Sequence, residues 1–434
     1  MTAYMYSTLN KPYSVFNFAR IFEFVLFILV LTLVMQDVVA QDVKGIRVHG
    51  FLSQGYLKST GNNDVFGNSS GSGSFDFREL GVNASYRPLP NLQFSGQLLS
   101  RSAGEDSKGG IRVDYGFVDY TAVSTESMDF GIRLGRTKNP LGFYNDTRDV
   151  PFTRPSILLP QSIYFDRTRN LGLASDGAQI YGESSNSWGD LNAQFGVVFP
   201  QTGDRSTEFA ILQGDRPGNL TPNLSYIGRL IYEYDGGRVR LAVSGAQVNT
   251  GYDAAQADPF SGLGSFQFTP IIFSAQYNTE RWSLTSEYAI RHLERHNFAN
   301  RSARDLNFTG ESYYFQGIYR FSPSWEGVLR YDAYYADRDD RDGKKFASGI
   351  PGAVQDYFPA HSRFAKDITV GLRWNVTPSI MLRAEYHYIN GTGWISSLDN
   401  RAPSEIRTQL RLPFLPADTD QHWNLFAFQA SYRF

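Results

Sequence analysis

The sequence predicts an all-β fold, a transmembrane antiparallel β-barrel of about 16 strands. Segments of about ten residues alternate apolar and polar side chains, which is the length a tilted strand needs to cross a bilayer. Short and long connections follow one another in turn along the chain. The chain is 15% aromatic, yet its mean hydropathy is negative. Strands that face lipid on one side and water on the other have this mixed composition.

Charge and cysteine content exclude several classes of protein. The 434 residues hold 41 Lys and Arg against 43 Asp and Glu, with six His and no Cys. Disulfide scaffolds and thiolate metal sites are excluded, and nothing in the composition predicts a cofactor or a metal. The near-neutral balance also lacks the basic field that attracts a polyanion, so we expect no nucleic-acid partner.

The first 40 residues have the pattern of a signal peptide. Lys11 and Arg20 precede a 15-residue apolar run at 21–35, which is shorter than a membrane-spanning helix usually needs. Ala40 provides a small residue before a cleavage site, although an uncleaved helical anchor is the alternative. Residues 45–434 contain no comparable apolar run, so a membrane location requires a single closed barrel there.

The clearest predicted strand is the last one, at 423–434. Its even positions, including Phe428, Tyr432 and Phe434, form an apolar face, and Gln429 and Ser431 lie on the other face. The same period of two orders segments near 46–57, 93–98, 130–134, 190–197, 313–321 and 368–375. We therefore expect the apolar face of each strand to contact lipid and the polar face to contact water.

The number of connections gives the number of strands. Short turns rich in Pro, Gly, Asn, Asp and Ser fall at 88–91, 122–127, 184–187, 235–237, 278–281, 322–324 and 377–379. Long polar stretches fall at 60–74, 102–111, 136–176, 200–225, 249–269, 292–311, 336–366 and 390–421. Seven short and eight long connections in alternation imply about sixteen strands, an even number. A soluble β-sandwich or propeller gives no reason for every second connection to be long.

Tryptophan marks one rim of the predicted barrel. Trp188, Trp282 and Trp325 each follow a short turn, and Trp374 lies just before one. Tryptophan is favoured at a membrane interface, where its ring is buried and its N–H stays hydrated. Four of the six Trp therefore indicate that the short turns lie at one membrane surface.

With these features together, the chain resembles the sixteen-stranded trimeric porins of Gram-negative outer membranes. The resemblance covers the predicted barrel, and its most specific element is the terminal pattern of Phe428, Tyr432 and Phe434. It implies export by the signal peptide, residence in the outer membrane, short periplasmic turns and long extracellular loops. It also implies a homotrimer, contacts with outer-membrane lipid and lipopolysaccharide, and recognition of the terminal residues by the barrel-assembly machinery.

The resemblance implies that residues 136–176, the third long connection, fold into the barrel and narrow its channel. An apolar patch at 157–159 gives this segment something to pack against, and four Pro limit its freedom. An outward loop or a subunit contact is the alternative. The charged candidates in and beside the segment are Arg133, Arg136, Lys138, Arg148, Arg154, Arg167, Arg169, Asp149 and Asp166. Strand parity adds Arg47, Arg330, Arg373 and Arg383 on the water-filled side.

These residues predict a porin through which small hydrophilic solutes or ions diffuse passively. Guanidinium groups that face passing anions would give a weak anion preference. A non-conducting structural or adhesin barrel is one alternative, and an outer-membrane hydrolase is another. We expect no enzyme, because no nucleophile elbow appears and the polar clusters around the few His have no catalytic pattern.

Overall fold

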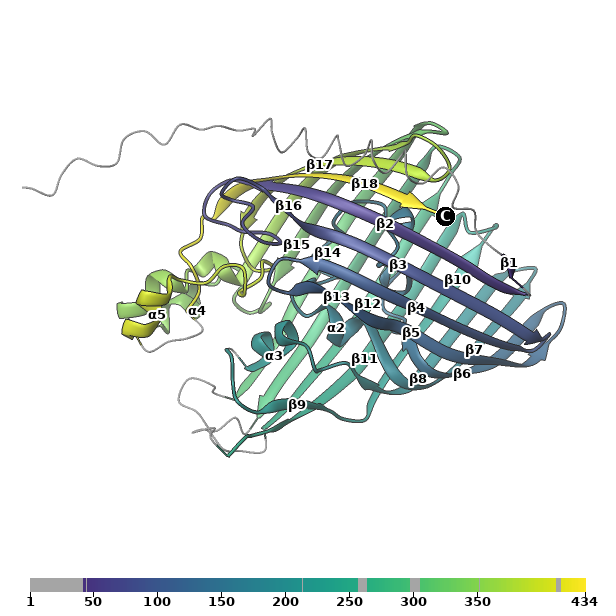
Figure 1. The fold of residues 1–434 in the computed structure, drawn as a ribbon, viewed down its shortest axis with the longest axis horizontal. Helices are drawn as coiled ribbons and strands as arrows, with labels where there is room; N and C mark the ends of the chain where they lie inside the picture. The colour runs from purple at the N-terminus through teal and green to yellow at the C-terminus, as the bar shows by residue number, and fades with distance from the viewer. Residues whose placement is uncertain are drawn as a thin grey trace, which may run out of the picture. The chain divides into compact units, whose positions relative to one another are not determined.

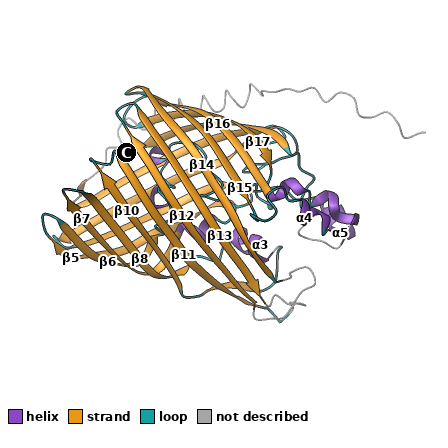
Figure 2. Cartoon of the chain, turned by 180° about the vertical axis from the view of Figure 1, so that it is seen from behind, coloured by secondary structure: helices purple, strands orange, loops and turns teal. Residues whose placement is uncertain are grey.

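The computed structural model describes residues 42–43, 45–212, 214–256, 264–296, 305–350, 352–410 and 415–434. The predicted signal peptide lies outside the described residues. Sixteen long strands form one antiparallel sheet that closes on itself, because each strand pairs with the next and the last pairs with the first (Figures 1 and 2). The prediction of a sixteen-stranded antiparallel barrel is confirmed.

The strands run in chain order around the ring. They are β2 (Ile46–Ser59), β3 (Ser74–Leu89), β4 (Leu92–Ala103), β5 (Ser107–Ser124), β6 (Met128–Lys138), β7 (Ala174–Asn186), β8 (Gly189–Pro200), β10 (Ser225–Tyr234), β11 (Val239–Asp253), β12 (Gly264–Asn278), β13 (Trp282–His296), β14 (Leu306–Ser322), β15 (Trp325–Tyr335), β16 (Phe364–Asn375), β17 (Ile380–Gly391) and β18 (His422–Arg433). Two short additions, β1 (Asp42–Val43) and β9 (Asn219–Pro222), pair with β2 and β11.

Short helices occur in the long connections, and helices α4 and α5 lie at the left end of the barrel in Figure 1. The helices are η1 (Asn145–Thr147), η2 (Pro151–Thr153), α2 (Arg169–Leu173), α3 (Arg205–Leu212), α4 (Lys344–Ser348), η3 (Gly352–Tyr357), η4 (Ala360–Arg363) and α5 (Ser404–Leu410). None of the helices in the described ranges is long and apolar enough to span a membrane.

The alternation of short and long connections is observed, with one correction. The predicted long loop at 102–111 is only three residues, 104–106, because β5 begins at Ser107. The polar residues after 106 pair with β4, as in the pair Ser102 and Lys108. Strands that continue beyond the apolar band carry polar residues on both faces, so they look like loops in the sequence.

The outer face carries the apolar residues that the alternation predicts. Leu329, Phe315 and Val370 are more than half exposed in the isolated chain. Near the short turns the exposed rings of Trp325 and Trp374 stack with centroids 5.1 Å apart. These exposed rows of apolar and aromatic side chains match the lipid-facing band and girdle of a membrane barrel.

Strand β18 closes the ring against β2. The Gly50 N–H donates to the Phe434 carbonyl at 3.1 Å, and the Phe434 N–H donates to the Gly50 carbonyl at 3.0 Å. A Cβ at Gly50 would lie 2.4 Å from Cζ of the Phe434 ring, so the ring would have to move if any other residue stood there. The closure therefore combines backbone pairing with a ring that covers a glycine.

The inner face is less polar than expected at the long-loop end. One apolar cluster joins Leu159, Ile163 and Tyr164 to Ile211 and Leu212 of α3. A second cluster contains Ile157, Leu158, Val65, Phe66, Trp394, Ile395, Trp423 and Leu425, among others. The expectation of a wholly polar interior is wrong here, because inward Trp423, Leu425 and Ala427 pack under loops instead of facing water.

Candidate functional site

Residues 139–173, called the inner loop below, lie inside the ring of strands. Their backbone and side chains bond inward-facing residues of strands spread around the barrel: Glu79 of β3, Arg229 of β10, Glu287 of β13, Arg330 of β15 and Glu385 of β17. Strands on different sides of the ring reach the same segment only if that segment crosses the interior.

Glu79 and Arg154 form a buried ion pair between the inner loop and the barrel wall, the ring of strands around it. Arg154 donates two hydrogen bonds to the Glu79 carboxylate, at 3.1 and 2.5 Å, and both side chains are almost fully buried. Arg101 of β4 lies 3.5 Å from the same carboxylate and 2.9 Å from Asp166 of the inner loop. Paired, planar contacts of this kind fix the position of the arginine as well as its charge.

Asp166 also belongs to a second group of buried ion pairs. Its carboxylate pairs with Arg169 at 3.1 Å, and Arg169 also pairs with Asp149, which contacts Lys138. Burial alone would raise the pKa of Asp166, but the surrounding arginines outweigh burial and hold that pKa well below its usual range. Burial would also raise the pKa of Asp149, but the nearby charges of Arg169 and Lys138 outweigh burial and hold that pKa well below its usual range. Both carboxylates are therefore held as anions.

The tip of the inner loop, 154–158, is fixed through its backbone. Arg383 donates to the carbonyls of Arg154 and Ser156 at 3.1 and 2.8 Å, and Arg330 donates to the Leu158 carbonyl at 3.1 Å. The Glu385 carboxylate accepts the N–H groups of Ile157 and Leu158. The wall therefore satisfies donors and acceptors of a buried backbone segment that has no helix or sheet to do so.

A buried carboxylate anchors the other side of the inner loop. Glu287 of β13 accepts hydrogen bonds from the Tyr164 hydroxyl at 2.6 Å, the Tyr314 hydroxyl at 2.8 Å and the Ser274 hydroxyl at 2.6 Å. It also accepts the Phe143 N–H at 2.9 Å. Tyr164, Tyr314 and Arg101 were not among the predicted site residues, although Arg101 has the same inward parity as Gln97.

The structure brings most of the candidate residues of the inner loop together, but not in the expected setting. Arg148, Arg154 and Arg169 have side chains that are 4%, 4% and 6% exposed, because they pair with Glu79, Asp149 and Asp166. The expected row of arginines open to passing anions is therefore not formed by these three. They hold the inner loop to the wall.

Two other candidates lie away from the inner loop. Arg136 has the outward parity of Leu134 and binds Asp176 through two hydrogen bonds, at 2.7 and 3.0 Å. It therefore lies on the outer face and not in the interior. Arg47 is exposed near the short-turn end of β2.

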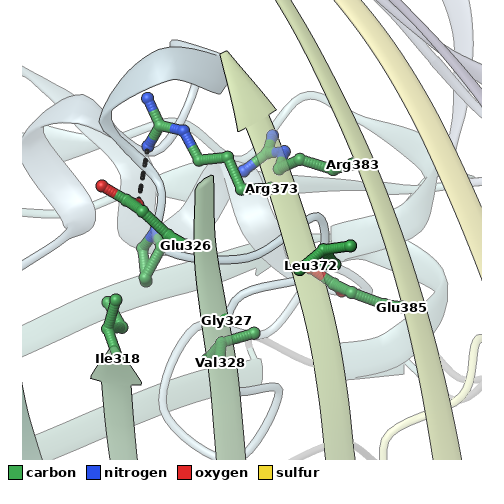
Figure 3. A pocket seen from close by; sticks show the side chains of 9 residues that line it. Ile318, Glu326, Gly327, Val328, Leu372, Arg373, Arg383 and Glu385 are labelled. Carbon is green, nitrogen blue, oxygen red and sulfur yellow. Dashed lines mark ion pairs between the residues drawn. The ribbon is translucent and has the colours of Figure 1, made fainter. Parts of the chain in front are cut away.

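Three half-buried ion pairs line the interior on the short-turn side of the inner loop. They are Arg133 with Asp119 at 2.9 Å, Arg240 with Glu233 at 2.6 Å, and Arg373 with Glu326 at 3.8 Å. Figure 3 shows the last pair beside Arg383 and Glu385 in a small pocket, which Pro155 of the inner loop also lines. Charged side chains of both signs are therefore accessible to water on the short-turn side of the inner loop.

Comparisons with known proteins support the fold. No protein-family model matches the chain, and no curated protein matches it by sequence. Among solved structures, the anion-selective porin from Comamonas acidovorans is similar with 14% identity and a TM-score of 0.53, over 90% of this chain and 99% of that one. The outer membrane channel DcaP of Acinetobacter baumannii has 12% identity and a TM-score of 0.52, over 91% and 99%. The trimer form of OmpT, an outer membrane protein of Vibrio cholerae, has 13% identity and a TM-score of 0.50, over 90% and 99%. The barrel fold of this chain is thus that of outer-membrane porins.

Proposed function

We propose that this barrel is a porin that lets small hydrophilic solutes or ions diffuse passively across an outer membrane. The observation that carries the proposal is an inner loop fixed across a closed sixteen-stranded barrel by buried ion pairs. A fixed segment of this kind narrows a lumen, and the width and charge of the remaining passage set which solutes pass. Two similar structures, an anion-selective porin and an outer membrane channel, support the same function.

We propose a weak anion preference that rests on Arg330 and Arg383, two of the expected residues, and not on the arginines of the inner loop. Arg330 and Arg383 donate their hydrogen bonds to hydroxyl, amide and carbonyl oxygens and not to carboxylates. With Arg101, Lys138, Arg148, Arg154 and Arg169 they make seven basic groups, which face six carboxylates: Glu79, Asp114, Asp149, Asp166, Asp332 and Glu385. The excess is basic, and burial reduces the screening of these charges by salt.

We also propose the cellular setting that the resemblance implies. The chain would reach the outer membrane through its signal peptide, assemble as a homotrimer, and contact lipid and lipopolysaccharide. The similar OmpT structure from Vibrio cholerae is a trimer form, which supports this assembly. Phe428, Tyr432 and Phe434 would be the residues that the barrel-assembly machinery recognises.

The test is the conductance of the refolded barrel, residues 41–434, in a planar bilayer. We expect lasting ohmic steps, and in a salt gradient a zero-current potential that favours anions weakly. Arg383→Gln should shift that potential toward cations, whereas Arg136→Gln, on the outer face, should leave it unchanged.

A non-conducting structural barrel is the second candidate, because two apolar clusters pack loops into the long-loop end. A correctly folded barrel that gives no steps would favour this candidate and refute the channel. Steps with a clear cation preference would instead refute only the anion preference.

A further inference from the structure

We infer that the interior of the long-loop end holds a binding site for a small oxyanion, built by Arg167, Arg291 and Arg363 around the hydroxyl of Tyr334. Its role in solute uptake rests on the proposed channel function, whereas binding itself does not need conduction. The three arginines come from the inner loop, from β13 and from η4, and Tyr334 lies near the end of β15.

The geometry brings two guanidinium groups onto Tyr334 and a third into electrostatic range of it. Arg167 donates to the Tyr334 hydroxyl at 3.2 Å, and the Arg291 guanidinium lies 4.6 Å from the centre of the Tyr334 ring. Arg363 is close enough to interact electrostatically with both Tyr334 and Arg167. Strand pairing explains this approach, because Tyr334 lies opposite Ala365, two residues from Arg363.

These three arginines, unlike Arg148, Arg154 and Arg169, have no ion pair with a described carboxylate. Arg291 is 7% exposed, donates to the backbone carbonyls of Glu311 and Tyr335, and leaves its Nε without a partner among the described residues. Arg363 contacts the rings of Phe308 and Phe346 and forms no ion pair with a described carboxylate.

The carboxylates that interact electrostatically with Arg291 and Arg363 accept hydrogen bonds from other groups. Asp332 accepts the Ser162 N–H, and Asp340 accepts the N–H groups of Lys345 and Phe346. Asp337 accepts the Asp339 N–H. These three carboxylates interact with the arginine cluster only at longer range.

Uncompensated like charges that are partly buried are costly, and a bound anion removes that cost. Burial lowers the pKa of Arg363 and outweighs the nearby Tyr334, which raises it. The neighbouring Arg167 also lowers this pKa, as repulsion between two guanidinium groups does. Guanidinium groups bind carboxylate and phosphate oxygens through planar pairs of hydrogen bonds. The chemistry therefore selects a compact oxyanion of the carboxylate or phosphate class.

The position of the site favours a free solute over a lipid headgroup. Arg291 and Tyr334 have the inward parity of Glu287 and Asp332, so both side chains face the interior and not the lipid. Arg167 and Arg363 are only partly buried, which leaves a path for an ion from the water in the interior. The Arg291 guanidinium lies 4.9 Å from the centre of the Phe165 ring, and the Arg363 guanidinium lies 5.6 Å from the centre of the Phe308 ring.

The test is calorimetric titration of the refolded barrel in detergent with inorganic phosphate, and separately with acetate, in a constant chloride background. We expect saturable binding of at least one of these ions, weakened at least about tenfold by Arg363→Gln or Arg167→Gln, which corresponds to about 1.4 kcal/mol. Arg363→Lys, which keeps the charge but not the planar fork, should weaken binding less than Arg363→Gln.

Arg341→Gln is the matched control, because Arg341 lies at the same end of the barrel but pairs with Glu311. No saturable binding of either ion to wild type, equal losses in the control and the cluster variants, or no loss in either cluster variant would overturn the site. Retained heat-modifiable mobility shows that each variant still folds, and Arg363→Lys provides a second variant if Arg363→Gln does not. Binding without conductance would refute the channel and keep the site, whereas conductance without binding would refute only the site.

Discussion

Single buried carboxylates decide where the inner loop lies. Glu79 is nearly inaccessible to water and holds Arg154 through two hydrogen bonds while Arg101 approaches from β4. Glu233, in contrast, pairs with Arg240 where both side chains are about one-third exposed. Removing one member of a buried pair leaves an uncompensated charge, and removing one member of an exposed pair does not.

Glu79→Gln should therefore destabilise the docked inner loop by about 3 to 5 kcal/mol. Glu233→Gln should cost less than about 1 kcal/mol. Hydrogen exchange of the backbone amides of the inner loop measures both effects on the folded barrel. Similar exchange rates in the two variants would show that Arg154 does not anchor the inner loop.

At the scale of elements, the loops at the long-loop end are joined to one another by buried acids. Asp106, between β4 and β5, accepts hydrogen bonds from Ser206 of α3 and from Ser396, both at 2.7 Å. Asp399 accepts the Glu105 N–H at 2.8 Å. Burial raises the pKa of Asp106 to about 7 and that of Asp399 to about 6.

These raised pKa values predict that loop docking weakens as pH rises. A carboxyl whose pKa is higher in the docked state contributes fully below its ordinary pKa of 3.8, and that contribution is lost progressively until pH passes about 7. Exchange of amides at 392–410, corrected for the intrinsic pH dependence, should therefore be about tenfold faster at pH 8 than at pH 6. Asp106→Asn should flatten this difference, and an unchanged pH profile in that variant would assign the effect to another group.

The strands were predictable because a two-residue period is local, whereas the site depended on distant partners. Alternation placed β18 and the parity of Arg330 and Arg383 correctly. The partner of Arg154 is 75 residues away, and no local pattern indicates that Glu79 and Arg154 meet. The inner apolar clusters did leave a signal, since at 423–428 both faces of the strand carry apolar residues.

At the scale of the whole molecule, the alternating connections predict which end faces which compartment. Ser187 lies in a short turn and Asp339 in the long connection between β15 and β16, and both are exposed. The native chain has no Cys, so single cysteines can be introduced without background. On intact cells, an impermeant thiol reagent should label Asp339→Cys and not Ser187→Cys. Labelling of Ser187→Cys from outside would reverse the proposed orientation.

Closure of the barrel should be unusually sensitive at one glycine. Gly50→Ala places a Cβ 2.4 Å from the Phe434 ring, whereas at Gly96 the nearest atom is 3.6 Å away. Gly50→Ala should therefore lower the fraction of folded, heat-modifiable barrel, and Gly96→Ala, on the same outward parity, should not. Equal yields for the two variants would show that the Phe434 ring moves aside without cost.

The pairing of β18 with β2 also dictates the order of biogenesis. The two strands bring together residues as distant as Ser53 and Ser431, which are 378 positions apart. Until the end of the polypeptide has been exported, β2 has an unpaired edge that invites pairing with other chains. The nascent protein must therefore be kept from aggregating for the whole time of its export. A truncation that removes only β18 would leave two open edges and cost the cell the entire barrel, not one-sixteenth of it.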